Sequence, residues 1–238
     1  MFKLLAAIFM FIDHFGHIFN QHIPYELYLV LRSIGRLAFP MYAYAIAKGF
    51  NRTSNINKYI SRMFIMSIVT QSLFYLVTNS FNQEDFYFYN VLITFTMALL
   101  FMSGFEDISH DDTTRAIIGS FKLIISFFIT VFLEPDYGVI GLVIVVIFQG
   151  LDKYYSDSNK VYLYYFLTLF GLNLMNIIGQ DLSSLTYYSF ISFWQVLAVA
   201  FFPFESKEKK PGNISKIANY WFYPIHYVLL LMVETWWR

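Results

Sequence analysis

The chain has 238 residues, with 16 Lys plus Arg and 16 Asp plus Glu, so its formal net charge is zero. Only 13% of the residues are charged, against about 25% in an ordinary soluble domain, while 58% are hydrophobic. This balance excludes a basic nucleic-acid-binding protein and a disordered chain. The absence of Cys excludes a disulfide framework and a thiolate nucleophile. A soluble protein this apolar would expose large aggregating patches, so membrane lipid is the solvent that the composition fits.

Nine apolar stretches approach the roughly 20 residues that a membrane-spanning helix needs. They cover residues 2–20, 26–47, 59–78, 89–105, 115–133, 137–151, 161–178, 184–204 and 218–235. Two of them, 89–105 and 137–151, are short, so a merged or re-entrant element is an alternative there. The stretches and their loops use almost the whole chain. We therefore predict an all-α fold, a single polytopic membrane helical bundle over residues 1–238.

The first stretch does not resemble a cleavable signal peptide, because it lacks a small-residue cleavage site and carries Asp13, His14 and His17. The loops then orient the bundle, since basic residues collect on the cytoplasmic side. With the N-terminus inside, thirteen of the 16 Lys and Arg residues fall on inner segments and only Arg238 falls outside. The other two lie within the second stretch. The alternation predicts the N-terminus inside and the C-terminus outside.

Ionisable side chains inside the membrane are costly and mark function by default. Here they are Asp13, His14, His17, Arg32, Arg36 and His226. Five of the six belong to the first two stretches, which a short loop makes antiparallel neighbours. We expect the acid and the imidazoles of the first stretch to contact the arginines of the second. The plainest alternative is that Asp13 pairs with Arg32 or Arg36 only to lock two helices together.

The histidines leave further alternatives. His226 stands alone in the last stretch, and an interhelical polar contact explains it as well as a site does. His14 and His17 have a spacing that could bind zinc, but the sequence forces no third ligand. We therefore expect no metal.

Several motifs occur in order along nearly the full chain. The strongest are Ile12-Asp13-His14-Phe15-Gly16 and Leu31-Arg32-x-x-Gly35-Arg36-Leu37-Ala38-Phe39-Pro40, followed by Ala47-Lys48-Gly49-Phe50. Weaker ones are Thr70-Gln71, Asn90-Val91-Leu92, Tyr137-Gly138-Val139-Ile140-Gly141 and Tyr223-Pro224-x-His226. Together they resemble the TraX family, named for the membrane enzyme that acetylates the N-terminus of F-type pilin. Where that family often has an acid before the final Gly-Phe, this chain has Lys48.

The resemblance implies a multi-pass acyltransferase of the bacterial cytoplasmic membrane, distantly similar to the transmembrane acyltransferases. Acetyl-CoA would be the co-substrate, and the acceptor an exported peptide, pilin or glycan. The catalytic residues carried over are His14, Asp13, Arg36 and Arg32. The residues expected to bind the phosphates of acetyl-CoA are Lys48, Arg52, Lys58 and Arg62, and positive-inside topology alone accounts for each of these equally well. The residues expected to contact substrate are His17, His226, Asn90 and Gln71.

The chemistry of acetyl transfer suits these residue types. A neutral His14 could take the proton from an incoming amine or hydroxyl, with Asp13 orienting it. Arg36 or Arg32 could stabilise the tetrahedral oxyanion. Two rival hypotheses use the same residues: a proton-coupled transporter built on this cluster, and a non-catalytic membrane scaffold.

Overall fold

Helices account for nearly all of the chain that the structure describes, and no strand occurs in that part. The computed structural model describes residues 1–80, 89–156, 158, 160–178, 191–206 and 213–237. Its helices are α1 (Phe2–Ile18), α2 (Tyr25–Gly35), α3 (Ala38–Arg52), α4 (Ile56–Ser80), α5 (Val91–Ile108), α6 (Thr113–Leu133), α7 (Gly138–Tyr155), α8 (Val161–Ile178), the 3₁₀ helix η3 (Ser192–Phe201), α10 (Phe202–Ser206) and α11 (Asn213–Trp237). The predicted all-α fold is confirmed for these residues.

Within the described residues, five helices are long and apolar enough to cross a membrane: Ile56–Thr78 of α4, α5, α6, α7 and α8. The stretches that were expected to be short form full helices, since α5 and α7 each have 18 residues. Helix α6 shows the membrane character most plainly. Phe121, Phe128 and Phe132 are 63%, 54% and 78% exposed on it. Such a surface would aggregate in water, whereas lipid acyl chains solvate it, so this is a helical membrane protein.

The prediction of one continuous helix over residues 26–47 was wrong, because the chain breaks at Arg36 and Leu37, between α2 and α3. Pro40 explains the position. It has no N–H to donate to the carbonyl of Arg36 four residues earlier, and its ring clashes with that carbonyl. The eighth predicted stretch, 184–204, lies partly outside the described residues. From Ser192 onwards it forms η3 and α10 instead of one α-helix.

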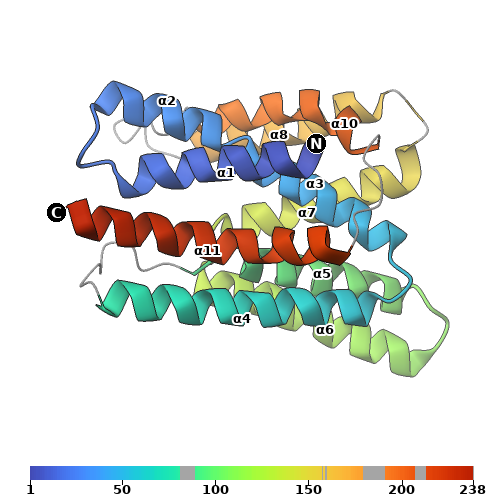
Figure 1. Ribbon diagram of the computed structural model, residues 1–238. Helices are drawn as coiled ribbons and strands as arrows, with labels where there is room; N and C mark the ends of the chain where they lie inside the picture. Colours follow the sequence, from blue (N-terminus) through green and yellow to red (C-terminus); the bar gives the residue numbers. More distant parts are fainter. Residues whose placement is uncertain (81–88, 157, 159, 179–190, 207–212, 238) are drawn as a thin grey trace.

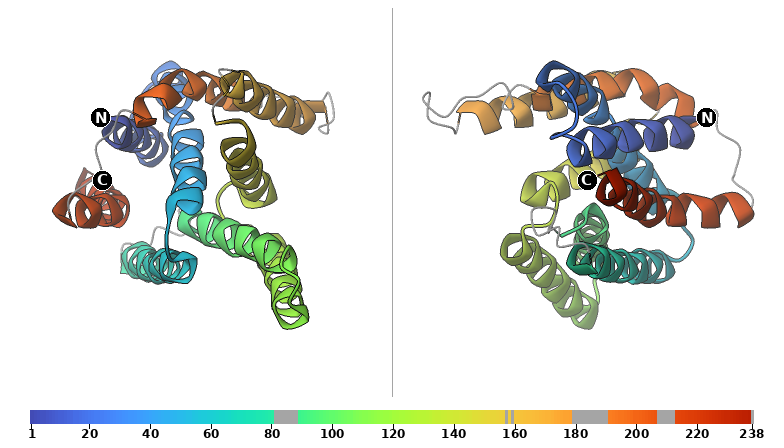
Figure 2. Two further views of the ribbon diagram at one scale, coloured as in Figure 1. Left: turned by 90° about the vertical axis from the view of Figure 1, so that its right-hand side faces the viewer. Right: turned by 60° about the vertical axis from the view of Figure 1, so that its left-hand side comes forward.

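Helix α3 occupies the centre of the bundle (Figure 2). It packs against α1, α5, α7 and η3, and ten of its 15 residues are buried. Ala43 and Ala47 are fully buried, and such small side chains allow neighbouring helices to approach closely. Helix α1 packs against α2, α3 and α11, and α11 also packs against α4. Residues at the start of α3 are therefore surrounded by elements from both halves of the chain.

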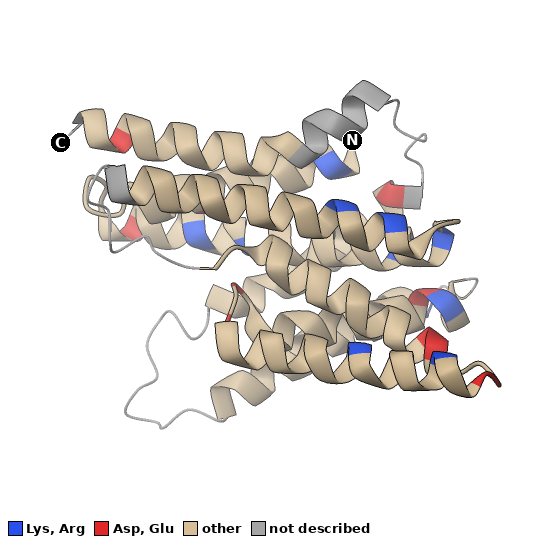
Figure 3. Ribbon diagram, turned by 90° about the horizontal axis from the view of Figure 1, so that it is seen from below, with Lys and Arg blue, Asp and Glu red and all other residues tan. Residues whose placement is uncertain are grey.

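The bundle has two ends of different charge. Helices α1, α4, α6 and α8 begin at the same end, whereas α11 ends at the opposite one (Figure 1). Most of the Lys and Arg residues gather at the end where α1 begins (Figure 3), and we call this the basic end. Arg36 lies in the break between α2 and α3, and α3 runs from there to the basic end (Figure 1).

Candidate functional site

Two glycines bring α1 and α2 into close contact. A Cβ on Gly35 would overlap the Asp13 side chain, and one on Gly16 would lie 2.9 Å from the Cβ of Leu31. The resulting approach lets Arg32 Nη1 donate to Asp13 Oδ2 at 2.5 Å, with both side chains mostly buried. The expected contact is confirmed for the acid, since the partner of Asp13 is Arg32, whereas His14 bonds to His226 of the last helix instead.

His14, the residue after Asp13, contacts the last helix of the chain. Its Nδ1 lies 2.7 Å from Nε2 of His226, and the two rings are nearly parallel. The other ring nitrogen of His226, Nδ1, lies 2.6 Å from the carbonyl oxygen of Phe222. Both histidines are buried. The structure thus joins α1 to α11 through a chain of two imidazoles and one carbonyl.

This chain fixes where the protons of the neutral rings lie. A carbonyl only accepts, so Nδ1 of His226 must carry the proton that it donates to Phe222. Nε2 of His226 is then an acceptor, and Nδ1 of His14 donates to it. Nε2 of His14 is left without a proton. The rings of Tyr223 and Tyr227 pack against His14, and those of Phe11 and Phe222 pack against His226. His14 therefore presents a bare nitrogen in a buried site.

Arg36 lies in the break after α2, and its Nη1 donates to Tyr137 Oη at 3.3 Å. Tyr137 begins α7 with a positive φ of 65°, and its ring stacks on Phe39 at 3.7 Å. Among the described residues no carboxylate lies within ion-pairing distance of Arg36. Its guanidinium is thus held by a neutral hydroxyl and keeps N–H groups for another acceptor.

The loop before Tyr137 carries Asp136, which the sequence analysis missed. Its backbone N–H donates to the carbonyl of Tyr89 and its carbonyl accepts from Thr94 Oγ1, so the loop is fixed against α5. Burial raises the pKa of Asp136 to about 6, although the nearby positive charge of Arg36 acts in the opposite direction. This carboxyl group can therefore change its charge close to neutral pH.

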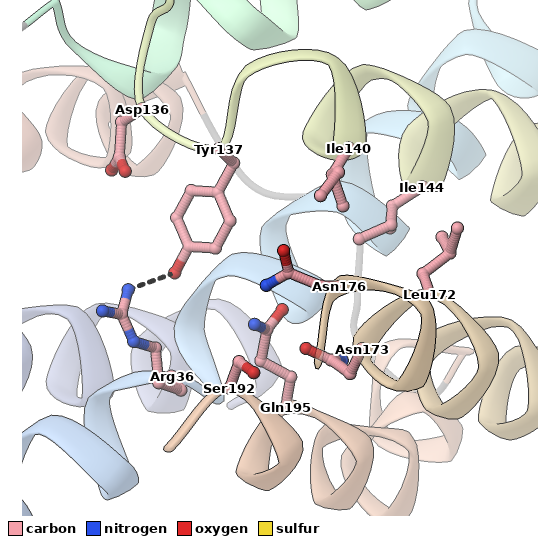
Figure 4. A pocket seen from close by; sticks show the side chains of 10 residues that line it. All are labelled: Arg36, Asp136, Tyr137, Ile140, Ile144, Leu172, Asn173, Asn176, Ser192 and Gln195. Atoms are coloured by element: carbon pink, nitrogen blue, oxygen red, sulfur yellow. Dashed lines mark hydrogen bonds between the residues drawn. The ribbon is translucent and has the colours of Figure 1, made fainter. Parts of the chain in front are cut away.

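A cavity of about 400 Å³ opens beside Arg36, between the break after α2, the loop before α7, and helices α7, α8 and η3 (Figure 4). Its lining residues are Arg36, Asp136, Tyr137, Ile140, Ile144, Leu172, Asn173, Asn176, Ser192 and Gln195. Arg36 and Tyr137 face a group of carboxamide side chains across it (Figure 4). The polar residues of α8 and η3 were not singled out from the sequence, because uncharged amides were not counted among the membrane-embedded groups. A buried Asn or Gln within an apolar stretch was the available signal.

The predicted substrate residues Gln71 and Asn90 bond to each other. Asn90 Nδ2 donates to Gln71 Oε1 at 2.8 Å, and Asn90 Oδ1 accepts from the backbone N–H of Leu92 at the start of α5. Asn90 is fully buried. This pair caps α5 and ties it to α4. His17, the third predicted substrate residue, is partly buried in the last turn of α1.

The four residues expected to bind phosphates lie at the basic end but differ in environment. Lys48 is buried, 3.1 Å from Glu205 Oε2 and 3.8 Å from Asp152 Oδ1. Arg52 is 56% exposed and contacts the other oxygen of Glu205 at 3.1 Å. Lys58 and Arg62 are exposed on α4. Within the described residues, no group of three His, Cys, Asp or Glu side chains gathers closely enough to hold a metal ion.

The fold and the site together define a helical membrane protein with a buried centre of histidine, arginine and aspartate. The chain belongs to the TraX family, since the family described as "TraX protein" matches residues 1–234. It is also similar to the protein named "Probable fimbrial assembly protein FimC, serogroup H1" of Dichelobacter nodosus, with 26% identity over 235 residues, 96% of this chain and 92% of that protein. No solved structure matches the chain.

Proposed function

We propose that this protein is a multi-pass membrane acyltransferase that moves an acetyl group from acetyl-CoA to an envelope acceptor during fimbrial or pilus assembly. The observation that carries the proposal is the bare Nε2 of His14, held in a buried site with two arginines nearby. Membership of the TraX family and the name of the D. nodosus relative support the link to fimbriae. The expected location is the bacterial cytoplasmic membrane.

The reaction needs a base and a group that stabilises negative charge. Nε2 of His14 takes the proton from the acceptor amine or hydroxyl as the acceptor attacks the thioester carbonyl. Arg36 has N–H groups to spare and receives the oxyanion that forms. As this intermediate collapses, the C–S bond breaks and the proton on His14 passes to the leaving sulfur. Arg32 and Asp13 are paired, so we assign them the role of fixing α2 against α1 beside His14.

Acetyl-CoA enters the protein at the basic end. We propose that this end faces the cytoplasm, because Lys and Arg residues collect on that side of membrane proteins. The exposed Lys58 and Arg62 are the residues best able to engage phosphates. Lys48 and Arg52 already contact Glu205, and they act there as part of a neutralised cluster. Helix α3 connects the break at Arg36 to the basic end, since its 15 residues span about 22 Å.

The proposal is tested with full-length protein in lipid vesicles, supplied with radiolabelled acetyl-CoA and a peptide with a free α-amine or a glucan oligomer. Wild type should consume thioester and label one acceptor, and Arg36→Ala should lose at least tenfold in rate. If wild type neither binds nor consumes acetyl-CoA with the chain folded, the enzyme hypothesis fails.

One observation favours a second candidate, a proton-coupled transporter. Substrate sites of transporters often lie where a membrane helix is broken, as it is here at Arg36. The same vesicles separate the two functions, because a transporter would produce a proton-dependent solute flux without thioester loss.

A further inference from the structure

Two carboxamide side chains inside the helix bundle have no role in the reaction described above. Asn173 comes from α8 and Gln195 from η3, and they are only 7% and 6% exposed. They line the cavity opposite Arg36 and Tyr137 (Figure 4). Burying an amide inside a membrane protein costs free energy unless its hydrogen bonds are made. Their presence at the wall of a cavity therefore calls for a partner.

Gln195 lacks such a partner for its side-chain oxygen among the described residues. Its Oε1 is buried and has no hydrogen-bond partner there. Asn173 Nδ2 donates to the carbonyl of Leu169 at 2.7 Å, one turn earlier in its own helix, which leaves its oxygen free to accept. Figure 4 shows the amide group of Gln195 turned into the cavity, towards Arg36 and Tyr137. Unused hydrogen-bonding capacity is thus concentrated at one wall.

The chemistry of the walls selects a kind of ligand. A carboxamide presents a donor and an acceptor side by side, which is the pattern that a secondary amide presents in return. A second wall is aliphatic, made of Ile140, Ile144 and Leu172. Among the described residues of the lining, Tyr137 carries the one aromatic ring, and a face of it is already stacked on Phe39. These features fit an aliphatic chain that contains amides better than a sugar ring. The cavity volume of about 400 Å³ lies in the range of small-ligand sites.

We infer that this cavity binds a short aliphatic amide chain, with Gln195 and Asn173 as the residues that recognise the amide. The inference rests on the proposed function and deepens it, because both substrates of the transfer can carry this chemistry. The pantetheine arm of acetyl-CoA contains two secondary amides, and a peptide acceptor contains them in its backbone. The cavity shares Arg36 with the reaction centre, so a chain bound there would end next to the reacting groups.

The test measures binding to full-length protein in lipid nanodiscs by calorimetry, with pantetheine and trialanine amide as two separate probes and glucose as the probe without an amide. The variants are Gln195→Leu and Asn173→Leu, and Gln21→Leu removes an exposed carboxamide outside the cavity as the matched control. We expect at least one amide probe to bind wild type and Gln21→Leu equally, and at least tenfold more weakly to both cavity variants. Binding of trialanine amide alone identifies the site as the acceptor site, and binding of pantetheine alone identifies it as the site of the donor arm.

Thermal unfolding separates recognition from a structural role. Since Oε1 of Gln195 has no partner in the empty cavity, Gln195→Leu should unfold at the same temperature as wild type or higher. A lower unfolding temperature for Gln195→Leu, or cavity variants that bind the amide probes as wild type does, would overturn the inference. So would binding of glucose alone or of no probe, even in a protein that consumes acetyl-CoA. Amide binding without thioester consumption would instead leave the cavity assignment standing and remove the proposed function.

Discussion

Two charged clusters lie near opposite ends of α3, and they use their charges differently. At the basic end, Lys48 and Arg52 meet Glu205 and Asp152, so every charge has an opposite partner. In the centre around His14, the hydroxyl of Tyr137 is the one side-chain partner of Arg36 among the described residues, and His14 keeps a nitrogen without a proton. Paired buried charges hold helices together, whereas hydrogen-bonding groups without a partner can bind a substrate or stabilise a developing charge. The comparison assigns structure to the first cluster and chemistry to the second.

The largest expected effect is on the rate, from His14→Gln. Removing a general base costs about 10²- to 10⁴-fold, and we expect this loss in acetyl transfer from a variant that remains folded, although Nε2 of His226 loses its donor. The control is His110→Gln, which changes an exposed histidine in a loop. Transfer rates with labelled acetyl-CoA measure both. A His14→Gln variant with the wild-type rate would place the chemistry elsewhere.

A loss of stability is expected from the basic-end cluster. Lys48→Met removes a buried cation from between two carboxylates, and we expect a cost of about 3 kcal/mol. The figure is at the low end for a buried pair, because Arg52 still reaches Glu205 and Asn51 still reaches Asp152. Arg52→Met, at an exposed position, should cost under about 1 kcal/mol. Denaturation in detergent micelles measures the free energy of unfolding of both variants. Equal losses would contradict the conclusion that Lys48 contributes most to the stability of the cluster.

The contact between α1 and α2 predicts a smaller loss. Gly35→Ala forces a methyl group against Asp13 and should destabilise the protein by about 1–3 kcal/mol. Gly150→Ala is the matched change in α7, where an added Cβ meets nothing within 4 Å. It should stabilise by about 0.5–1 kcal/mol through helix propensity. Unfolding curves measure both variants, and a neutral Gly35→Ala would mean that the two helices need no such close approach.

A pH dependence of stability is expected from Asp136. Its folded pKa of about 6 lies above the ordinary value of 3.8, so the folded protein holds this proton more tightly than the unfolded chain. The contribution is complete below about pH 4 and is lost as the pH rises through 6. Thermal stability of wild type should therefore fall over this range relative to Asp136→Asn. Parallel curves for the two proteins would show that Asp136 titrates normally.

Local sequence features predicted the contact of α1 with α2. A loop of a few residues makes two apolar stretches antiparallel, and a lone buried acid then needs one of the nearby arginines. Asp13 could therefore be paired with Arg32 or Arg36 without coordinates, and the structure selects Arg32. The sequence also indicates the break at Arg36. Pro40 removes the hydrogen bond to residue 36, and this consequence was overlooked because the whole stretch is apolar.

Contacts between distant segments could not be predicted in the same way. His14 and His226 are 212 positions apart, and only the packing of α11 against α1 brings them together. Rarity inside the membrane marked each histidine as notable, but rarity does not name a partner. Gln195 and Asn173 carried still less signal, because a neutral amide in an apolar stretch does not reveal whether it lines a cavity or bonds a neighbouring helix.

The protonation of His14 decides whether it can serve as a base. Nitrogen-15 NMR of the histidine-labelled protein in nanodiscs at pH 7, with His14→Gln and His226→Gln spectra to assign the signals, measures it directly. The account predicts a protonated Nδ1 and a bare Nε2 on His14, with a scalar coupling through the hydrogen bond to Nε2 of His226. A His14 ring protonated on Nε2 would contradict the account, because such a nitrogen has no lone pair with which to accept the acceptor's proton.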